Sequence, residues 1–71
     1  MSRIINDVRQ LMNTDNVKSM NANEIFRRLS RTNLTNYGMK QFKKDNLMDV
    51  LNHYGKLSVI HIDQEENVIF L

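Results

Sequence analysis

The sequence predicts a small α+β fold in which three helices are followed by a C-terminal two-stranded β-hairpin. In three separate segments, apolar residues recur at intervals of three and four, which places them on one face of a helix. Residues 57–71 instead have the pattern of two apolar strands around a polar turn. A helix-turn-helix core closed by such a hairpin is typical of a winged helix.

The first helix is predicted over about residues 2–13, and polar residues 13–16 end it because their side chains offer the backbone competing hydrogen bonds. Its apolar stripe consists of Ile4, Ile5, Val8, Leu11 and Met12. The second helix is predicted to begin after Asn21 as N-cap, with Glu24 placed for a capping box, and to end near Ser30 or Arg31. Its buried face is expected to hold Ala22, Ile25, Phe26 and Leu29.

The third helix is predicted over about residues 45–54, with Lys44 or Asp45 at its cap and Gly55 as its stop. Its apolar stripe consists of Leu47, Val50, Leu51 and Tyr54. An unbroken helix from Met39 would place Lys43 in the middle of that stripe, which is an unfavourable position for an ammonium group. We therefore expect a loop or short helical turn around residues 36–43, with Phe42 inserted into the core.

The hairpin is predicted to contain a first strand over residues 57–62, a turn over residues 63–67 and a second strand over residues 68–71. Alternation places Leu57, Val59 and His61 on one face and Ser58, Ile60 and Ile62 on the other. No proline, repeat or glycine-rich linker divides the chain, so residues 1–71 are expected to form a single, monomeric domain.

Composition excludes several classes of function. The absence of cysteine rules out disulfides and thiolate metal sites, and it is consistent with an intracellular, reducing compartment. No apolar run approaches the roughly 20 residues of a membrane span. The chain has no phosphate-binding loop and no nucleophile beside a base at a recognised spacing. Asp49 and His53 alone are too few ligands for a catalytic zinc, so we expect no enzyme activity, no metal and no cofactor.

The charges are unevenly distributed. Residues 27–44 contain six basic residues and no acidic one, and these are the candidate nucleic-acid contacts: Arg27, Arg28, Arg31, Lys40, Lys43 and Lys44. The hairpin turn is acidic and would be repelled by phosphate if it lay along a duplex. Candidate partner-docking residues are two apolar residues in the basic loop and the three acids of the turn: Leu34, Tyr37, Asp63, Glu65 and Glu66. Nucleic-acid contact, protein contact and a merely solvated charged face all remain open.

Residues 46–71 resemble the C-terminal winged-helix domains of MCM replicative helicase subunits. The matching positions are Leu47, Val50, Leu51 and Tyr54 in the helix and Val68, Phe70 and Leu71 in the closing strand. The middle subunit of replication protein A has a C-terminal winged helix with a similar ending, and the acidic turn and long basic loop depart from the MCM pattern. The resemblance implies a non-catalytic nuclear module that docks replication or loading factors and contacts DNA nonspecifically.

Two other hypotheses stand beside this one. The first is a stand-alone winged-helix DNA-binding regulator from a phage or bacterium, in which Met1 is the true start. The second is a structural module that helps to hold a complex together.

Overall fold

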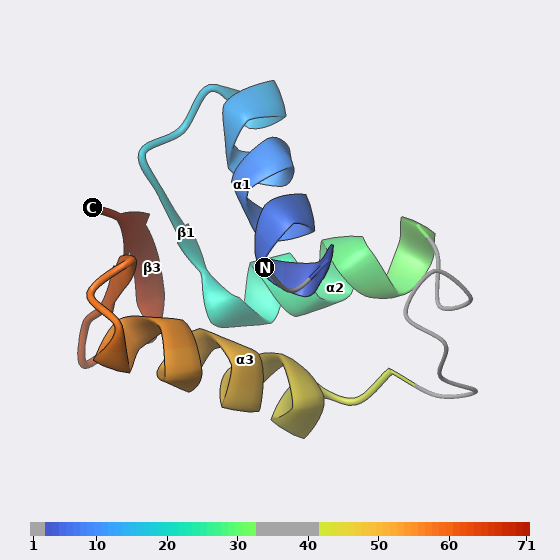
Figure 1. Ribbon diagram of the computed structural model, residues 1–71. Helices are drawn as coiled ribbons and strands as arrows, with labels where there is room; N and C mark the ends of the chain where they lie inside the picture. Colours follow the sequence, from blue (N-terminus) through green and yellow to red (C-terminus); the bar gives the residue numbers. More distant parts are fainter. Residues whose placement is uncertain (1–2, 33–41) are drawn as a thin grey trace.

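The computed structural model describes residues 3–32 and 42–71. These residues form three helices and a three-stranded antiparallel sheet, which confirms the predicted α+β class and is compatible with a winged-helix-like arrangement (Figure 1). The order along the chain is α1 (Arg3–Asp15), β1 (Ser19–Asn21), α2 (Ala22–Thr32), α3 (Lys44–Lys56), β2 (Ile60–Ile62) and β3 (Asn67–Phe70).

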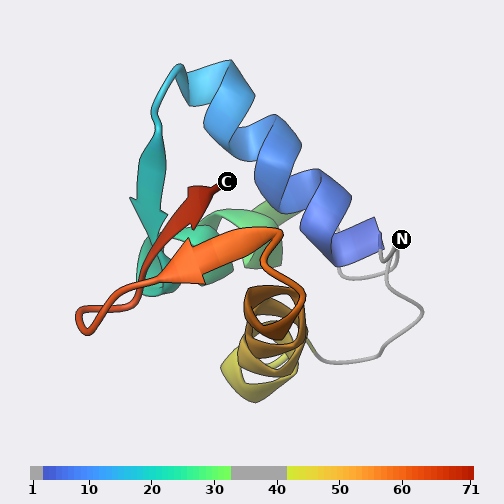
Figure 2. The same ribbon diagram turned by 60° about the vertical axis from the view of Figure 1, so that its left-hand side comes forward.

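The sheet contains a strand that was not predicted. β3 lies in the centre, between β1 and β2 (Figure 2). Met20 of β1 pairs with Val68 of β3, and Ile62 of β2 pairs with the same residue from the other side. The prediction of a two-stranded ribbon was therefore incomplete. β1 has three residues and one buried side chain, Met20, so it has no recognisable period and is defined only by pairing with β3.

The three predicted apolar stripes converge on one core. Ile5, Val8, Ile25, Leu47 and Leu51 have no exposed surface, and the sheet closes the core from one side. The remaining buried members are Ile4, Met12, Met20, Ala22, Leu29, Phe42, Ile60 and Val68. Because the helical phases were predicted from spacing alone, their convergence confirms the sequence interpretation of all three helices.

The N-terminus of α2 confirms the predicted N-cap but not the predicted capping box. The side-chain oxygen of Asn21 accepts the backbone N–H of Asn23 at 2.9 Å, so Asn21 is the N-cap. Glu24 does not complete a capping box but directs its carboxylate to Arg27 and Arg28. The helix extends to Thr32, slightly beyond the predicted end.

The start of α3 confirms the predicted break in helical phase. Lys43 has extended backbone (φ −105°, ψ 153°) and is the N-cap, one residue before the predicted cap at Lys44 or Asp45. Its side chain is exposed and does not enter the apolar stripe. The Asn46 side chain accepts the Lys43 backbone N–H at 3.1 Å. Phe42 is only 4% exposed, and its ring centroid lies 5.5 Å from that of Phe26, which confirms its predicted insertion into the core. The rest of the expected loop lies outside the described residues.

The end of α3 corrects two predictions. Gly55 does not stop the helix, which continues to Lys56 and ends in a Schellman motif. The N–H of Ser58 bonds to the Gly55 carbonyl and the N–H of Val59 bonds to the Tyr54 carbonyl, each at 3.1 Å. Ser58 has the left-handed φ of 60° that this motif requires. Residues 57–59 therefore form the helix end rather than the start of a strand. The prediction missed this motif because no glycine marks the position where the chain turns.

The hairpin faces agree with the predicted alternation once β2 begins. Ile60 and Val68 are buried against the helices. His61 and Ile69, which pair across the two strands, lie on the opposite face and are exposed. The hairpin thus covers the core with one face and leaves the other open to solvent.

Candidate functional site

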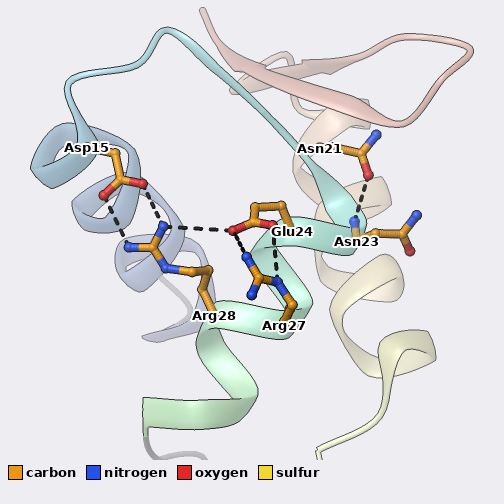
Figure 3. Close-up of polar contacts among 6 residues, drawn as sticks. All are labelled: Asp15, Asn21, Asn23, Glu24, Arg27 and Arg28. Atoms are coloured by element: carbon orange, nitrogen blue, oxygen red, sulfur yellow. Dashed lines mark hydrogen bonds and ion pairs between the residues drawn. The ribbon is translucent and has the colours of Figure 1, made fainter.

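Two of the three basic residues of α2 are paired with carboxylates. The guanidinium of Arg28 lies 2.6 Å from the Asp15 carboxylate of α1 and 3.9 Å from Glu24 (Figure 3). Arg27 donates from Nε to Glu24 at 3.2 Å and forms an ion pair with the same carboxylate. The segment from residue 27 to 44 has no acid of its own, but the fold brings Asp15 and Glu24 against it. Two of the six candidate nucleic-acid residues therefore already have anionic partners.

The pairing of Arg28 with Asp15 changes the ionisation of both groups. The hydrogen bond from Arg28 is the largest cause that lowers the pKa of Asp15 below its usual value. Burial opposes it with the second-largest effect, and the charge of Arg28 makes the smallest contribution to the lowering. The same hydrogen bond raises the pKa of Arg28. Both groups remain charged near neutral pH, so an incoming phosphate would have to compete with a carboxylate that is already present.

The other candidate cations fall into two groups. The Nζ of Lys44 lies 3.4 Å from Oε1 of Glu66, which joins the first turn of α3 to the hairpin turn. Arg31 and Lys43 are exposed, and no carboxylate among residues 3–32 and 42–71 lies within ion-pair distance of either. Lys40 lies outside the described residues. The open positive charge of the predicted stripe is thus reduced to Arg31 and Lys43 in the part of the chain that the structure describes.

The acidic hairpin turn is itself a hydrogen-bonded unit. One oxygen of Asp63 accepts the backbone N–H groups of Glu65 and Asn67, each at 2.9 Å, and the other accepts the Asn67 side chain at 3.1 Å. The backbone bond from Asn67 is the largest cause that lowers the pKa of Asp63. Asp63 therefore holds the turn together, and Glu65 is the predicted docking acid that points to solvent without a side-chain partner among the described residues.

The turn is also fastened to the start of α2. The Asn21 side chain donates to the Glu65 carbonyl at 2.8 Å, and the Ala22 N–H donates to the Glu66 carbonyl at 2.8 Å. Since Glu66 also pairs with Lys44, three elements meet at this turn. The hairpin turn is consequently held against the helices rather than free to lie along a duplex.

The solvent face of α3 carries two carboxylates beside the exposed Lys56 of its last turn. In helix-turn-helix proteins the second helix of the motif enters the major groove, and α3 follows α2 in that order. Here Asp45 and Asp49 are exposed on α3. His53 lies one turn beyond Asp49, and its ring meets Tyr54 edge-on at 5.2 Å. Within the described residues no group of three potential ligands is arranged as a metal site requires.

Sequence reasoning missed a groove between α1 and β3. It has a volume of about 370 Å³ and forms where the segment joining α1 to β1 diverges from the end of β3, an arching segment visible in Figures 1 and 2. The residues that line it are Arg9, Met12, Asn13, Val17, Lys18, Ile69 and Phe70. Its only sequence signal is Val17, an apolar residue in a polar stretch, and the groove exists only because β1 pairs with β3.

Leu34 and Tyr37, the two predicted apolar docking residues, lie outside the described residues. No helix of the described segments has the length and apolar character needed to cross a membrane. Comparison of the chain with family models, curated proteins and solved structures found no match in any of the three.

Proposed function

We propose that this domain is a non-catalytic protein-binding module and that any contact it makes with DNA is weak and nonspecific. The observation that carries the proposal is the pairing of three candidate cations with carboxylates: Arg27 with Glu24 of the same helix, Arg28 with Asp15 of α1, and Lys44 with Glu66 of the hairpin turn. Nonspecific affinity for DNA grows with the number of phosphates that a protein neutralises. A cation that already has an anionic partner contributes less to that number, because its partner must be displaced or left unpaired.

The acidic groups strengthen the case against duplex binding. Asp45 and Asp49 occupy the exposed face of α3, and Glu65 is exposed on the hairpin turn. α3 and the hairpin are the two elements that a winged helix would present to a duplex, and both would bring carboxylates toward phosphate. The geometry therefore favours a protein partner over nucleic acid.

Exposed apolar side chains provide the positive support. Val17, Ile69 and Leu71 remain accessible although the domain has a fully formed core, and Val17 and Ile69 border the same groove. Contiguous exposed apolar surface often marks a protein contact. In the setting that the resemblance of residues 46–71 implies, the partner would be a replication or loading factor; this assignment stays a prediction.

The test is an NMR titration of the ¹⁵N-labelled chain with a short duplex at two salt concentrations. We expect a dissociation constant no tighter than about 10⁻⁴ to 10⁻⁶ M, with shifts around Arg31 and Lys43 that fade as salt rises. The double substitution Glu65→Lys, Glu66→Lys should strengthen this binding, since it removes two negative charges and frees Lys44.

The matched control is Asp7→Lys on α1, away from the hairpin turn, and it is compared with the single substitution Glu65→Lys, which makes the same change of two charge units. Equal gains for these two single variants would show a response to net charge alone. Tight, sequence-dependent binding by the original chain would overturn the proposal and favour the DNA-binding regulator.

A further inference from the structure

The groove between α1 and β3 has an apolar interior. Met12 and Phe70 are largely covered by the fold, whereas Val17 and Ile69 are 40% and 36% exposed along its border. Exposed apolar side chains beside a depression lose contact with water when another apolar group enters it. A volume of about 370 Å³ lies at the small end of the range for ligand pockets, so the groove suits individual side chains rather than a whole helix.

Two cations border this apolar surface. The guanidinium carbon of Arg9 lies 4.9 Å above the centre of the Phe70 ring, a cation–π contact that holds the charge at the groove without neutralising it. Lys18 is exposed on the arching segment. No acidic side chain is among the described residues that line the groove. Arg9 thus differs from Arg27 and Arg28, whose charges are already matched by carboxylates.

Resting on the function proposed above, we propose that this groove binds an acidic segment of a protein partner. An apolar side chain of the segment enters between Val17 and Ile69, and its flanking carboxylates meet Arg9 and Lys18. Carboxylates pair with guanidinium groups in a planar, two-bond geometry, and Arg9 keeps its guanidinium presented above Phe70. A phosphate backbone would satisfy the cations but would leave the apolar border uncovered, so the combination of groups favours a peptide.

The experiment titrates the ¹⁵N-labelled chain with an acetylated, amidated hexapeptide in which leucine and glutamate alternate. Two comparison peptides replace leucine by serine or glutamate by lysine. We expect saturable shifts at Arg9, Val17, Lys18 and Ile69 with the first peptide and at least about tenfold weaker binding with either comparison peptide, because each removes one of the two interactions.

Charge reversals locate the site on the protein. Arg9→Glu and Lys18→Glu should each weaken the peptide about tenfold, whereas Arg31→Glu, an equal charge change on the last turn of α2, should change affinity less than about twofold. Thermal unfolding of each variant establishes that it is folded before the affinities are compared. A variant that fails this criterion is replaced by Arg9→Gln or Lys18→Gln, which remove the charge alone.

Several outcomes would overturn the groove assignment. Peptide shifts confined to α3 or the hairpin turn would leave a protein-binding module with its site elsewhere. Chemical-shift changes at the groove that appear without peptide as the protein concentration rises would show that a second copy of the chain occupies the groove. Equal binding of the lysine peptide would remove the role of Arg9 and Lys18. Duplex DNA binding at the groove in preference to the peptide would overturn both this inference and the proposed function.

Discussion

At the scale of single residues, Ser58 shows how the chain accepts local strain in order to turn. Its φ of 60° lies in the left-handed region that glycine occupies most easily, and the Schellman bonds at the end of α3 require it. The nearest glycine, Gly55, lies inside α3, where the conformational freedom of its backbone gives no advantage. The sequence therefore places its glycine three residues before the position that needs one.

Ser58→Gly should stabilise the domain by roughly 1 kcal/mol, because it removes the steric cost of the left-handed conformation. In a domain of this size, that change raises the melting temperature by about 4–8 °C. Thermal unfolding followed by circular dichroism measures the shift. Ser58→Ala is the control, since alanine keeps the Cβ atom and should bring no gain. A gain of similar size for both variants would contradict the assigned backbone strain.

At the scale of elements, the Asp63 carboxylate makes the stability that the hairpin turn contributes depend on pH. Its pKa in the folded state lies below the ordinary value of 3.8 because backbone and side-chain N–H groups, first that of Asn67, stabilise the carboxylate. As pH falls, the unfolded chain binds its proton first. The stabilisation by this carboxylate is therefore fully present above the ordinary pKa and is lost as pH falls through the lower, folded pKa.

We expect the free energy of unfolding to decrease as pH falls below about 4, and to decrease less in the variant Asp63→Asn, which lacks the titrating group. Urea unfolding at a series of pH values between neutrality and strong acid measures the effect. Gln64→Ala, at an exposed position of the same turn without a titrating group, is the control and should retain the parent dependence. A parent-like pH dependence in Asp63→Asn would show that the turn hydrogen bonds do not couple to stability.

At the scale of the whole molecule, the core depends on a few completely buried side chains shared among the three helices and the sheet. Leu51 of α3 has no exposed surface and belongs to the cluster that joins these elements. Small domains bury a limited fraction of their surface, so each such residue carries a large share of the stability.

Leu51→Ala should destabilise the domain by about 2–5 kcal/mol through lost burial and the cavity left behind. This loss is comparable with the total stability of many small domains, so the variant should be partly or wholly unfolded at 25 °C. Leu57→Ala, at a position that is 57% exposed, is the control and should lie within about 0.5 kcal/mol of the parent. Chemical denaturation measures the stability of both variants. Equal denaturation midpoints for Leu51→Ala and Leu57→Ala would show that Leu51 does not belong to the core.

Apolar periodicity determined the three helices and the break before α3, and residue type determined the N-cap at Asn21 and the insertion of Phe42. Each of these features depends on residues within one segment. Only the tertiary structure decided the rest. β1 is a strand only because it pairs with β3, and α3 ends at a Schellman motif that has Ser58 in place of glycine. The positive charge of Arg28 on α2 is balanced by Asp15 from a different helix. Most of these features depend on groups that lie far apart in the chain. The spacing of residues within one segment does not show which distant groups come into contact. The groove with Arg9 and Lys18 belongs to the same class, since three separate segments must assemble before it has walls.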